Sequence, residues 1–367
     1  MNPYDFARID WKHPPERHEP VWHHRLTGNQ PLYSGTLDLN IYAETPLFLA
    51  DPRGVPSDPR QPAQSMRNAQ WAYIIPGSSL KGLLRSVVET LGNGCLTLFD
   101  GDYERGGIRY RGNVPFAFLH CEKNTQLCIA CRIFGMLKER TGGVFLGKVN
   151  IGDAQADPEK TYLYDPMYTA VLVGPKPHHA AFYLDEERKY IAGRKFYFHH
   201  SPDYKPLAAS GPILFGGRPA NRFIQPLDYD TLFHARLDFT NLEESEFGAL
   251  LLAVTLEEDM RHKIGYGKPL GLGSVQLAPA RLTLIDYAAR YSRPDRGKTI
   301  LEGTDMWNFF YRFIDTFTQS HLSSQAFADL RRIWRWPPEP GVEYSYPGRE
   351  WFNTADNKRI ADTRNLR

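Results

Sequence analysis

Two stretches of the chain alternate apolar and polar residues with the two-residue period of a strand that is buried on one face. In residues 32–48, Leu37, Leu39 and Ile41 fall on one side and polar residues fall on the other. Residues 231–239 repeat the alternation. We therefore predict a strand in each stretch, with one face of a sheet turned towards the core.

A helix is predicted after each of these strands. Residues 73–89 contain a short apolar strand, a Pro-Gly turn and then leucines at helical spacing, with Ser78 or Ser79 as the capping residue. Residues 242–256 form a second amphipathic stretch, and a strand at 276–285 follows it.

Together these elements predict an α+β fold. The strand-helix-strand halves 35–89 and 231–285 give the β-α-β-β-α-β order of a ferredoxin-like core, which RNA-recognition-motif-like domains also use. Two more amphipathic helices are predicted at 306–317 and 327–334. The predicted domains are an N-terminal arm (1–32), a ferredoxin-like domain (33–289) and a helical C-terminal extension (290–367).

Composition places the chain among folded, soluble proteins. Apolar residues make up 42% of it and charged residues 23%, and no window of 18 apolar residues occurs. With no signal-peptide pattern at the N-terminus either, we expect a cytoplasmic protein without membrane contact. The formal net charge is only +2. A nucleic-acid site would therefore need a local concentration of cations.

Residues 264–275, here named the glycine ribbon, hold four glycines within nine residues. Backbone without a Cβ can approach a phosphate or a flat base closely. The spacing G-x-G-x-x-x-G-x-G and the following strand differ from a dinucleotide-binding fingerprint. The alternative is a glycine-rich hairpin without a ligand. The candidate binding residues of the ribbon are Gly265, Tyr266, Gly267, Lys268, Gly271 and Gly273.

The predicted helix after residue 77 offers a second anion site. Ser78 and Ser79 supply hydroxyl groups beside the free N–H groups of the first turn, and Lys81 and Arg85 share a face because they are four residues apart. The alternative is an ordinary capped helix with solvated cations.

Residues 193–200 interleave cations, aromatic rings and histidines on one short predicted strand. Arg194 and Lys195 beside Phe and Tyr residues are typical of single-strand binding, where rings stack on bases and cations contact phosphates. The adjacent His199 and His200 point to opposite faces of a strand, so one would be buried and one exposed.

The cysteines predict a structural zinc site. Cys121, Cys128 and Cys131 are closely spaced, and a Cys-x2-Cys pair with a third thiol is typical of tetrahedral zinc. The fourth ligand is Cys95 or His120. Free thiols are the alternative.

Three blocks of the sequence, residues 75–85, 131–135 and 262–275, resemble the signature blocks of the RAMP superfamily. The resemblance is to backbone subunits of CRISPR type III effector complexes, especially the type III-D-like branch, and of their type VII relatives. Residues 193–200 resemble a segment of that branch.

The resemblance implies a subunit that oligomerises along a CRISPR RNA and presents this guide for pairing with target RNA. It implies a zinc-binding insertion (about 93–135) and a thumb-like hairpin (about 155–200). Implied partners are CRISPR RNA, target RNA, further copies of the chain, other effector subunits and, in one branch, a separate nuclease. In this family Ser78, Ser79, Lys81 and Arg85 would hold the guide backbone and the glycine ribbon would lie along the same strand.

Target cleavage is less well supported. Type III subunits cut with an aspartate in the loop after the first strand, where Asp51 and Asp58 are the candidates here. The glycine pair that usually accompanies that aspartate is missing, and in type VII relatives the backbone subunit is inert. We therefore expect an RNA-binding scaffold more than an endoribonuclease, with Mg²⁺ needed only if the chain cuts RNA.

Two other functions stay open at this stage. One is a metal-dependent or metal-independent endoribonuclease that processes the CRISPR transcript. RAMP proteins of that kind rely on a histidine or a lysine, and His120, His199 and His200 are the candidates. A zinc-stabilised interaction protein would have no RNA role.

Overall fold

The computed structural model describes residues 1–25, 31–51, 56, 58, 60–97, 110–138, 143–172, 179–201, 203, 205–293, 296–347, 351 and 358–365. Within these residues the largest element is an eight-stranded sheet. Six of its strands follow in the order β16 (His262–Lys263), β17 (Ser274–Ile285), β2 (Tyr33–Ala43), β15 (Leu232–Leu242), β8 (Ala154–Ala156) and β4 (Ile74–Ile75). The other two are β18 (Lys298–Leu301), beside β17, and β7 (Val149–Ile151), beside β15.

The three long central strands are antiparallel, and their apolar residues meet on one face. Leu37 of β2 lies opposite Leu237 of β15 and Leu282 of β17. Leu37, Leu39 and Ile41 are all buried, and they alternate with partly exposed positions. The predicted strand in this stretch is therefore confirmed.

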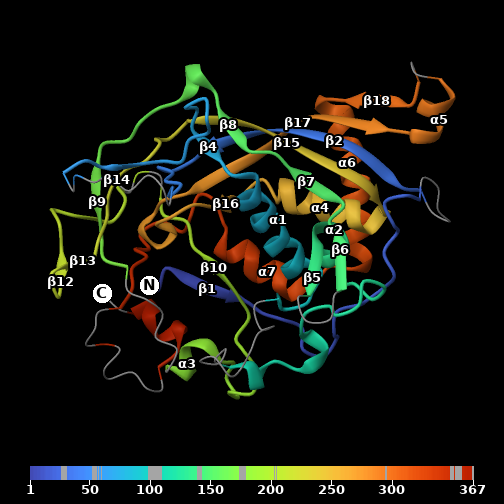
Figure 1. Cartoon of the computed structure of the whole chain (residues 1–367). Coiled ribbons are helices and arrows are strands. Elements are labelled where there is room, and N and C mark those ends of the chain that lie inside the picture. Colours follow the sequence, from blue (N-terminus) through green and yellow to red (C-terminus); the bar gives the residue numbers. More distant parts are fainter. Residues whose placement is uncertain are drawn as a thin grey trace.

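Helices cover the apolar face of the sheet (Figure 1). The predicted helices correspond to α1 (Gly77–Leu91), α4 (Glu244–Thr255), α6 (Gly303–Ser320) and α7 (Ser324–Ile333). Helix α4 is almost entirely buried, because α6 packs on the side that faces away from the sheet. Gly248 makes this packing close: a Cβ there would lie 2.2 Å from the carbonyl oxygen of Phe313.

The other face of the central strands is polar and its charges compensate one another. His234, Arg236 and Asp238 of β15 are exposed on it. Nε of Arg236 lies 3.9 Å from Oδ1 of Asp38 and 3.6 Å from Oδ1 of Asp238. This part of the sheet face therefore has no concentration of cations.

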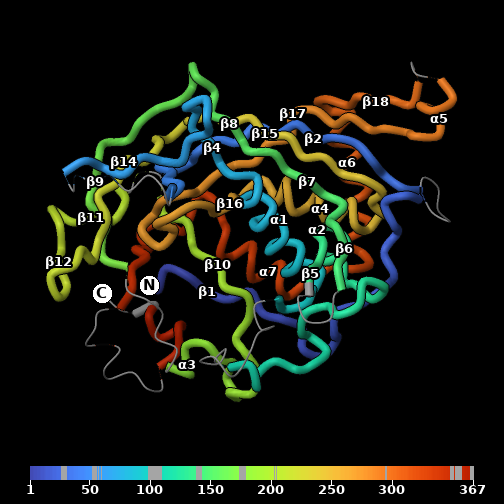
Figure 2. The backbone as a smooth tube through the Cα atoms, in the orientation of Figure 1, coloured from blue at the N-terminus to red at the C-terminus, as the bar shows by residue number. Residues whose placement is uncertain are grey.

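Smaller sheets and short helices surround the main sheet. Strand β1 (Tyr4–Ala7) pairs with β10 (Arg194–Tyr197), so the start of the chain lies beside its middle (Figure 2). In the described part of 155–200, strands β9 and β10 each pair with strands outside that range. The remaining elements are β3 (Ala63–Gln64), β9 (Met167–Thr169), β11 (Ala208–Ala209), β14 (Phe223–Gln225), β5 (Gly135–Lys138), β6 (Gly143–Leu146), β12 (Leu214–Phe215), β13 (Arg218–Pro219), α2 (Ile129–Phe134), α3 (Ala180–Tyr183) and α5 (Tyr287–Ser292).

The division predicted at residues 289 and 290 falls inside α5, within the connection from β17 to β18. This connection projects from the end of the sheet in Figure 1. None of the helices in the described ranges combines the length and the apolar character that crossing a membrane requires.

Candidate nucleic-acid interface and metal centre

A pocket of about 770 Å³ lies where three of the predicted motifs meet. Its walls come from the start of α1, from β10, from residues 263–268 and from residues 49–50. Half of the twelve candidate RNA-binding residues line it: Ser78, Ser79, Lys195, Gly265, Tyr266 and Lys268. Segments distant in the sequence are thereby brought to one place.

The first turn of α1 presents serine hydroxyls to this pocket. Ser79, Leu83 and Ser86 line it because residues three and four apart share a helix face. The prediction that Ser78 or Ser79 caps the helix is wrong. The helix starts earlier, with Pro76 in the capping position, so both serines lie within the first turn. The backbone N–H of Gly77 donates to Asp153 Oδ1 at 2.8 Å instead.

The glycine ribbon is shaped by backbone conformation. Its four glycines have positive φ angles, which side chains with a Cβ rarely adopt: Gly265 (87°), Gly267 (72°), Gly271 (96°) and Gly273 (82°). A Cβ on Gly273 would lie 1.9 Å from the carbonyl oxygen of Ile264, and one on Gly265 would lie 2.7 Å from that of Phe48. The glycines therefore fold the ribbon onto its neighbours, and of the four only Gly265 lines the pocket.

Three lysines concentrate positive charge in the pocket. These are Lys195, Lys263 and Lys268. None of the described residues that line the pocket is acidic, and no carboxylate of the described residues pairs with these amines. Burial, and next the charge of Lys268, lowers the pKa of Lys263 from 10.5 to about 7. Burial, and next Lys195, lowers the pKa of Lys268. An anion in the pocket would relieve this repulsion.

Lys263 is held by a buried polar network. Its Nζ donates to Ser274 Oγ at 3.0 Å, and that oxygen lies 2.8 Å from His199 Nδ1. His199 Nε2 lies 2.9 Å from the carbonyl oxygen of Arg261, so Nε2 donates and Nδ1 accepts from Ser274. Burial lowers the pKa of His199 well below its ordinary value. The imidazole is thus neutral, and Lys263 is the member of the network that can carry charge.

Aromatic rings form the apolar part of the pocket. Phe196, Tyr197, Tyr266 and Trp334 line it. The guanidinium of Arg222 lies over the Tyr266 ring, 5.0 Å from its centre. Trp334 is buried, and its Nε1 has no hydrogen-bond acceptor among the described residues. A base could stack on such rings, and its carbonyl could accept from this indole.

Lys81 and Arg85 do not line the pocket. Their face of α1 is turned to other strands: Lys81 Nζ donates to the carbonyl oxygen of Val149 at 2.8 Å. Arg85 pairs with Glu89 at 2.8 Å and donates to the carbonyl oxygen of Gly135 at 2.9 Å. Both cations satisfy polar groups inside the protein.

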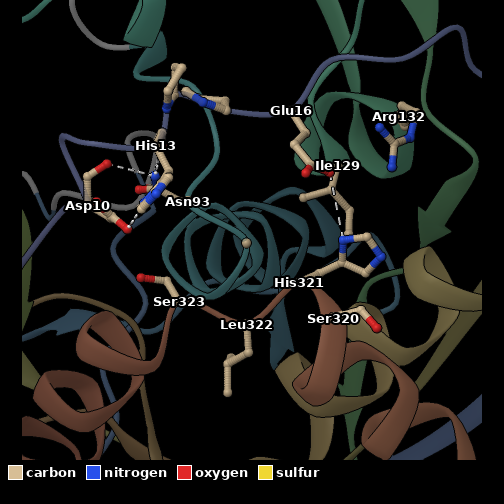
Figure 3. Close-up of a pocket in the computed structure, with 13 residues that line it drawn as sticks. Asp10, His13, Glu16, Asn93, Ile129, Arg132, Ser320, His321, Leu322 and Ser323 are labelled. Atoms are coloured by element: carbon tan, nitrogen blue, oxygen red, sulfur yellow. Dashed lines mark hydrogen bonds and ion pairs between the residues drawn. The ribbon is translucent and has the colours of Figure 1, made fainter.

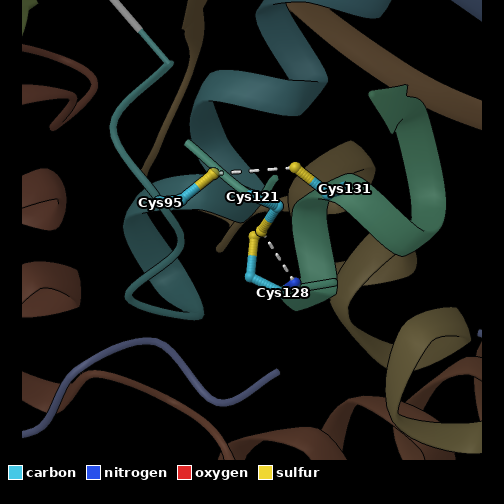
Figure 4. Close-up of side chains that lie close together, drawn as sticks. All are labelled: Cys95, Cys121, Cys128 and Cys131. Atoms are coloured by element: carbon cyan, nitrogen blue, oxygen red, sulfur yellow. Dashed lines mark hydrogen bonds between the residues drawn. The ribbon is translucent and has the colours of Figure 1, made fainter. Parts of the chain in front are cut away.

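The four cysteines form one buried cluster (Figure 4). The sulfur atoms of Cys95, Cys121, Cys128 and Cys131 lie within 4.8 Å of one another, and none forms a disulfide. Those of Cys95 and Cys131 are 3.6 Å apart. Zinc-sulfur bonds of about 2.3 Å place sulfurs about 3.8 Å apart in a tetrahedron, so the set fits zinc. Cys95 completes the set, and His120 is outside it.

Two arginines lie beside this cluster. An N–H group of Arg85 lies 3.5 Å from Cys131 Sγ. Arg194, another candidate RNA-binding residue, donates to the carbonyl oxygens of Gly94 and Cys95 at 2.7 and 3.1 Å and pairs with Glu89. Their positive charge favours thiolates, which are the form that binds metal.

The two candidate catalytic aspartates are outside the pocket lining. Asp51 follows Ala50, which does line it. Asp58 pairs with Arg60 at 3.0 Å, and this partner lowers the pKa of its carboxyl group. Residues 52–55, 57 and 59, between and beside these aspartates, lie outside the described residues.

The candidate histidines are buried. His200 packs against Gly271, where a Cβ would lie 3.2 Å from its Nδ1, and burial lowers its pKa to about 3. The expectation that one of His199 and His200 would be exposed is wrong, because segments pack over both sides of the chain that follows β10.

A smaller pocket of about 270 Å³ offers a contrast (Figure 3). There His13 lies 2.8 Å from Asp10, and His321 lies 3.9 Å from Glu16. In this smaller pocket each of the two histidines lies beside a carboxylate. The uncompensated lysines therefore distinguish the larger pocket.

Sequence reasoning included Phe196 and Tyr197 in the predicted strand at 193–200, but it did not single out Lys263 or Trp334. Lys263 directly precedes the glycine ribbon, and this position could have pointed to it. Trp334 comes from the end of α7, so only the folded chain brings it to the pocket.

The family-model comparison matches the RAMP superfamily over residues 40–276, which is more than half of the chain. A search of curated proteins found no match. The matched range contains the start of α1, the cysteine cluster, β10 and the glycine ribbon. The chain belongs to the RAMP superfamily.

Proposed function

We propose that the chain is an RNA-binding backbone subunit of a CRISPR effector complex, of the type III or type VII branch, and that the lysine-lined pocket holds the guide strand. RAMP membership fits a CRISPR-associated role in RNA binding or processing. The observation that carries the proposal is the set of three lysines with no acidic residue in a pocket that also contains aromatic rings. Cations for phosphates and rings for bases are the two parts of a single-strand site.

Binding of a single-stranded RNA of about 30 nucleotides tests this role. Lys195→Ala with Lys268→Ala removes two phosphate partners, so the slope of log affinity against log salt should decrease by about 1.4. The matched control is Lys12→Ala with Lys160→Ala, two exposed lysines outside the pocket. An unchanged slope in the pocket variant would refute the site. Sequencing the RNA that copurifies with a co-expressed CRISPR array tests whether this RNA is a guide.

We further propose a ferredoxin-like core made of β2, α1, β7 and β8, β15, α4 and β17. Chain order and sheet order support it: β17 and β15 flank β2, and β7 and β8 lie beyond β15. This is the arrangement in which two strand-helix-strand halves interleave. A structural zinc ion on the cysteine cluster would link residues 95 and 121–131 within this fold.

A metal-independent endoribonuclease is the second candidate. It is favoured by Lys263, because a pocket amine with a pKa of about 7 can exchange a proton at neutral pH. Incubation of repeat RNA with the purified chain in EDTA separates the two functions. The scaffold leaves the RNA intact, whereas cleavage lost in Lys263→Arg would establish the enzyme.

A further inference from the structure

The connection between β17 and β18 forms an arm at one end of the main sheet. The strands pair from Leu282 opposite Leu301 to Ile285 opposite Lys298. Asp286 N donates to the carbonyl oxygen of Gly297 at 2.8 Å and closes the tip, which contains α5. Figures 1 and 2 show this tip projecting away from the body, far from the start of α1. We name residues 286–293 and 296–298 the arm tip.

The arm tip concentrates exposed cations. Arg290, Arg293, Arg296 and Lys298 are exposed, and none of them pairs with a carboxylate of the described residues. Asp286 instead accepts from the backbone N–H of Ala289 as the cap of α5. At the base of the arm, by contrast, Arg281 pairs with Glu302. Asp295, which stands between Arg293 and Arg296 in the sequence, lies outside the described residues. Among the described residues, these four cations of the tip have no carboxylate partner, whereas the cation at the base is paired.

Aromatic rings accompany these cations. Tyr287 and Tyr291 are stacked, with ring centres 6.3 Å apart and planes inclined by 27°. Tyr291 is 77% exposed, which is a large apolar ring left in water. An exposed tyrosine among guanidinium groups matches a base and its phosphates better than it matches an acidic peptide, which offers carboxylates and no flat partner for the ring.

We propose that the arm tip is a second contact for single-stranded RNA, separate from the lysine-lined pocket. The arginines bind phosphates, and Tyr291 stacks on a base. Strand β17 begins at the end of the glycine ribbon and has 12 residues, so the tip lies about 40 Å along the sheet from the ribbon. One long strand, or two different strands, can occupy pocket and tip together. The inference extends the proposed RNA-binding function and adds a site to it.

The test compares RNA of about 30 nucleotides, which can reach both sites, with RNA of about 6 nucleotides, which covers one site. Arg290→Ala with Arg293→Ala and Arg296→Ala should weaken binding of the long RNA about tenfold at low salt and decrease its salt slope by about 2. Binding of the short RNA in the pocket should change little. The matched control removes three exposed lysines elsewhere, by Lys12→Ala, Lys123→Ala and Lys160→Ala.

Two further variants separate binding from folding. Replacing the same three arginines by lysine keeps the charge and should keep most of the salt slope. Tyr291→Ala should abolish ultraviolet crosslinking of the tip to RNA, whereas Tyr291→Phe should retain it, because stacking needs the ring only.

The proposals for the pocket and for the arm tip can be refuted independently of each other. If Lys195→Ala with Lys268→Ala weakens both RNAs while the arm variant binds like its control, the pocket stands and the arm proposal is overturned. If the arm variant loses long RNA while the pocket variant does not, the arm stands and the proposed pocket fails. Normal RNA binding by the arm variant with loss of an acidic protein partner would also overturn the proposal.

Discussion

Lys263 is a buried amine whose contacts leave its charge uncompensated. It is 4% exposed, and its amine donates a hydrogen bond to the neutral Ser274 hydroxyl. Its pKa is about 7 in the folded chain and 10.5 in the unfolded one. Between these values the unfolded chain binds the extra proton, so without RNA stability rises with pH in this window. A phosphate beside the amine would reverse the preference and favour the protonated lysine.

RNA binding should therefore weaken as pH rises through about 7, because free Lys263 loses its proton there. Lys263→Arg, which stays charged, should bind equally at about pH 6 and pH 8.5, and Lys263→Met should bind weakly at both. Anisotropy titrations at constant ionic strength measure this. A wild-type pH profile in Lys263→Met would contradict the role of this amine.

The cysteine set was predictable residue by residue, whereas the lysine site was not. Thiols are scarce in the chain, and their spacing named all four cysteines of the cluster once Cys95 was allowed as the alternative to His120. Spacing also placed Lys81 and Arg85 on one helix face. It could not say that this face meets Val149 and Gly135, because those contacts depend on strands elsewhere in the chain.

Cys128→Ser should abolish binding of one zinc ion per chain and lower stability by about 4 kcal/mol or more, since a closed thiolate site contributes to folding. Metal analysis and denaturant unfolding check both effects. The His120→Ala variant should bind as much zinc as the wild type, because His120 lies outside the cysteine cluster. Equal zinc content in wild type and Cys128→Ser would contradict the assignment.

At the scale of elements, helices and strands followed from periodicity, and the ribbon did not. Apolar spacing located α1, α4, α6 and α7 to within a few residues. The four glycines were interpreted as bare backbone for a ligand. In the structure they fold residues 264–275 against neighbouring carbonyl groups, and this packing has no periodic pattern to reveal it.

Gly273→Ala should destabilise the chain by about 2 kcal/mol or more, because its Cβ would overlap the carbonyl oxygen of Ile264 and its φ is 82°. Gly82→Ala is the matched control. Its Cβ meets open space within α1, so it should stabilise by about 0.5–1 kcal/mol. Denaturant unfolding compares the two variants, since at equal m-values the midpoint reports the change in stability. A similar loss of stability in both variants would refute the explanation.

At the scale of the molecule, a buried carboxylate connects three parts that are distant in the sequence. Glu246 of α4 accepts from Arg132 of α2 at 2.7 Å and from Lys148, beside β7, at 2.8 Å. Both cations and the carboxylate are buried. The sequence predicted the helix that carries Glu246. It could not predict that the three charged residues meet, because nothing local in a charged residue identifies its partner in the core.

Glu246→Gln should cost about 3–5 kcal/mol, since it leaves two buried cations without their counter-charge. Burial raises the pKa of Glu246, but the nearby charges of Lys148 and Arg132 outweigh this effect and lower the pKa below 4.5. Stability from this carboxylate is therefore present above pH 4.5 and is lost as pH falls through the lower folded value. The variant should lose this acid dependence. The exposed control Glu302→Gln should leave the unfolding midpoint nearly unchanged.

The pocket is built from residues between Leu49 and Trp334. A ribosome delivers the N-terminal part first, so Trp334 is the last residue of the pocket lining to be synthesised. A nascent polypeptide that stops before α7 would carry the lysines and lack the indole behind them. The complete pocket therefore forms only after α7 and the residue that follows it have been synthesised.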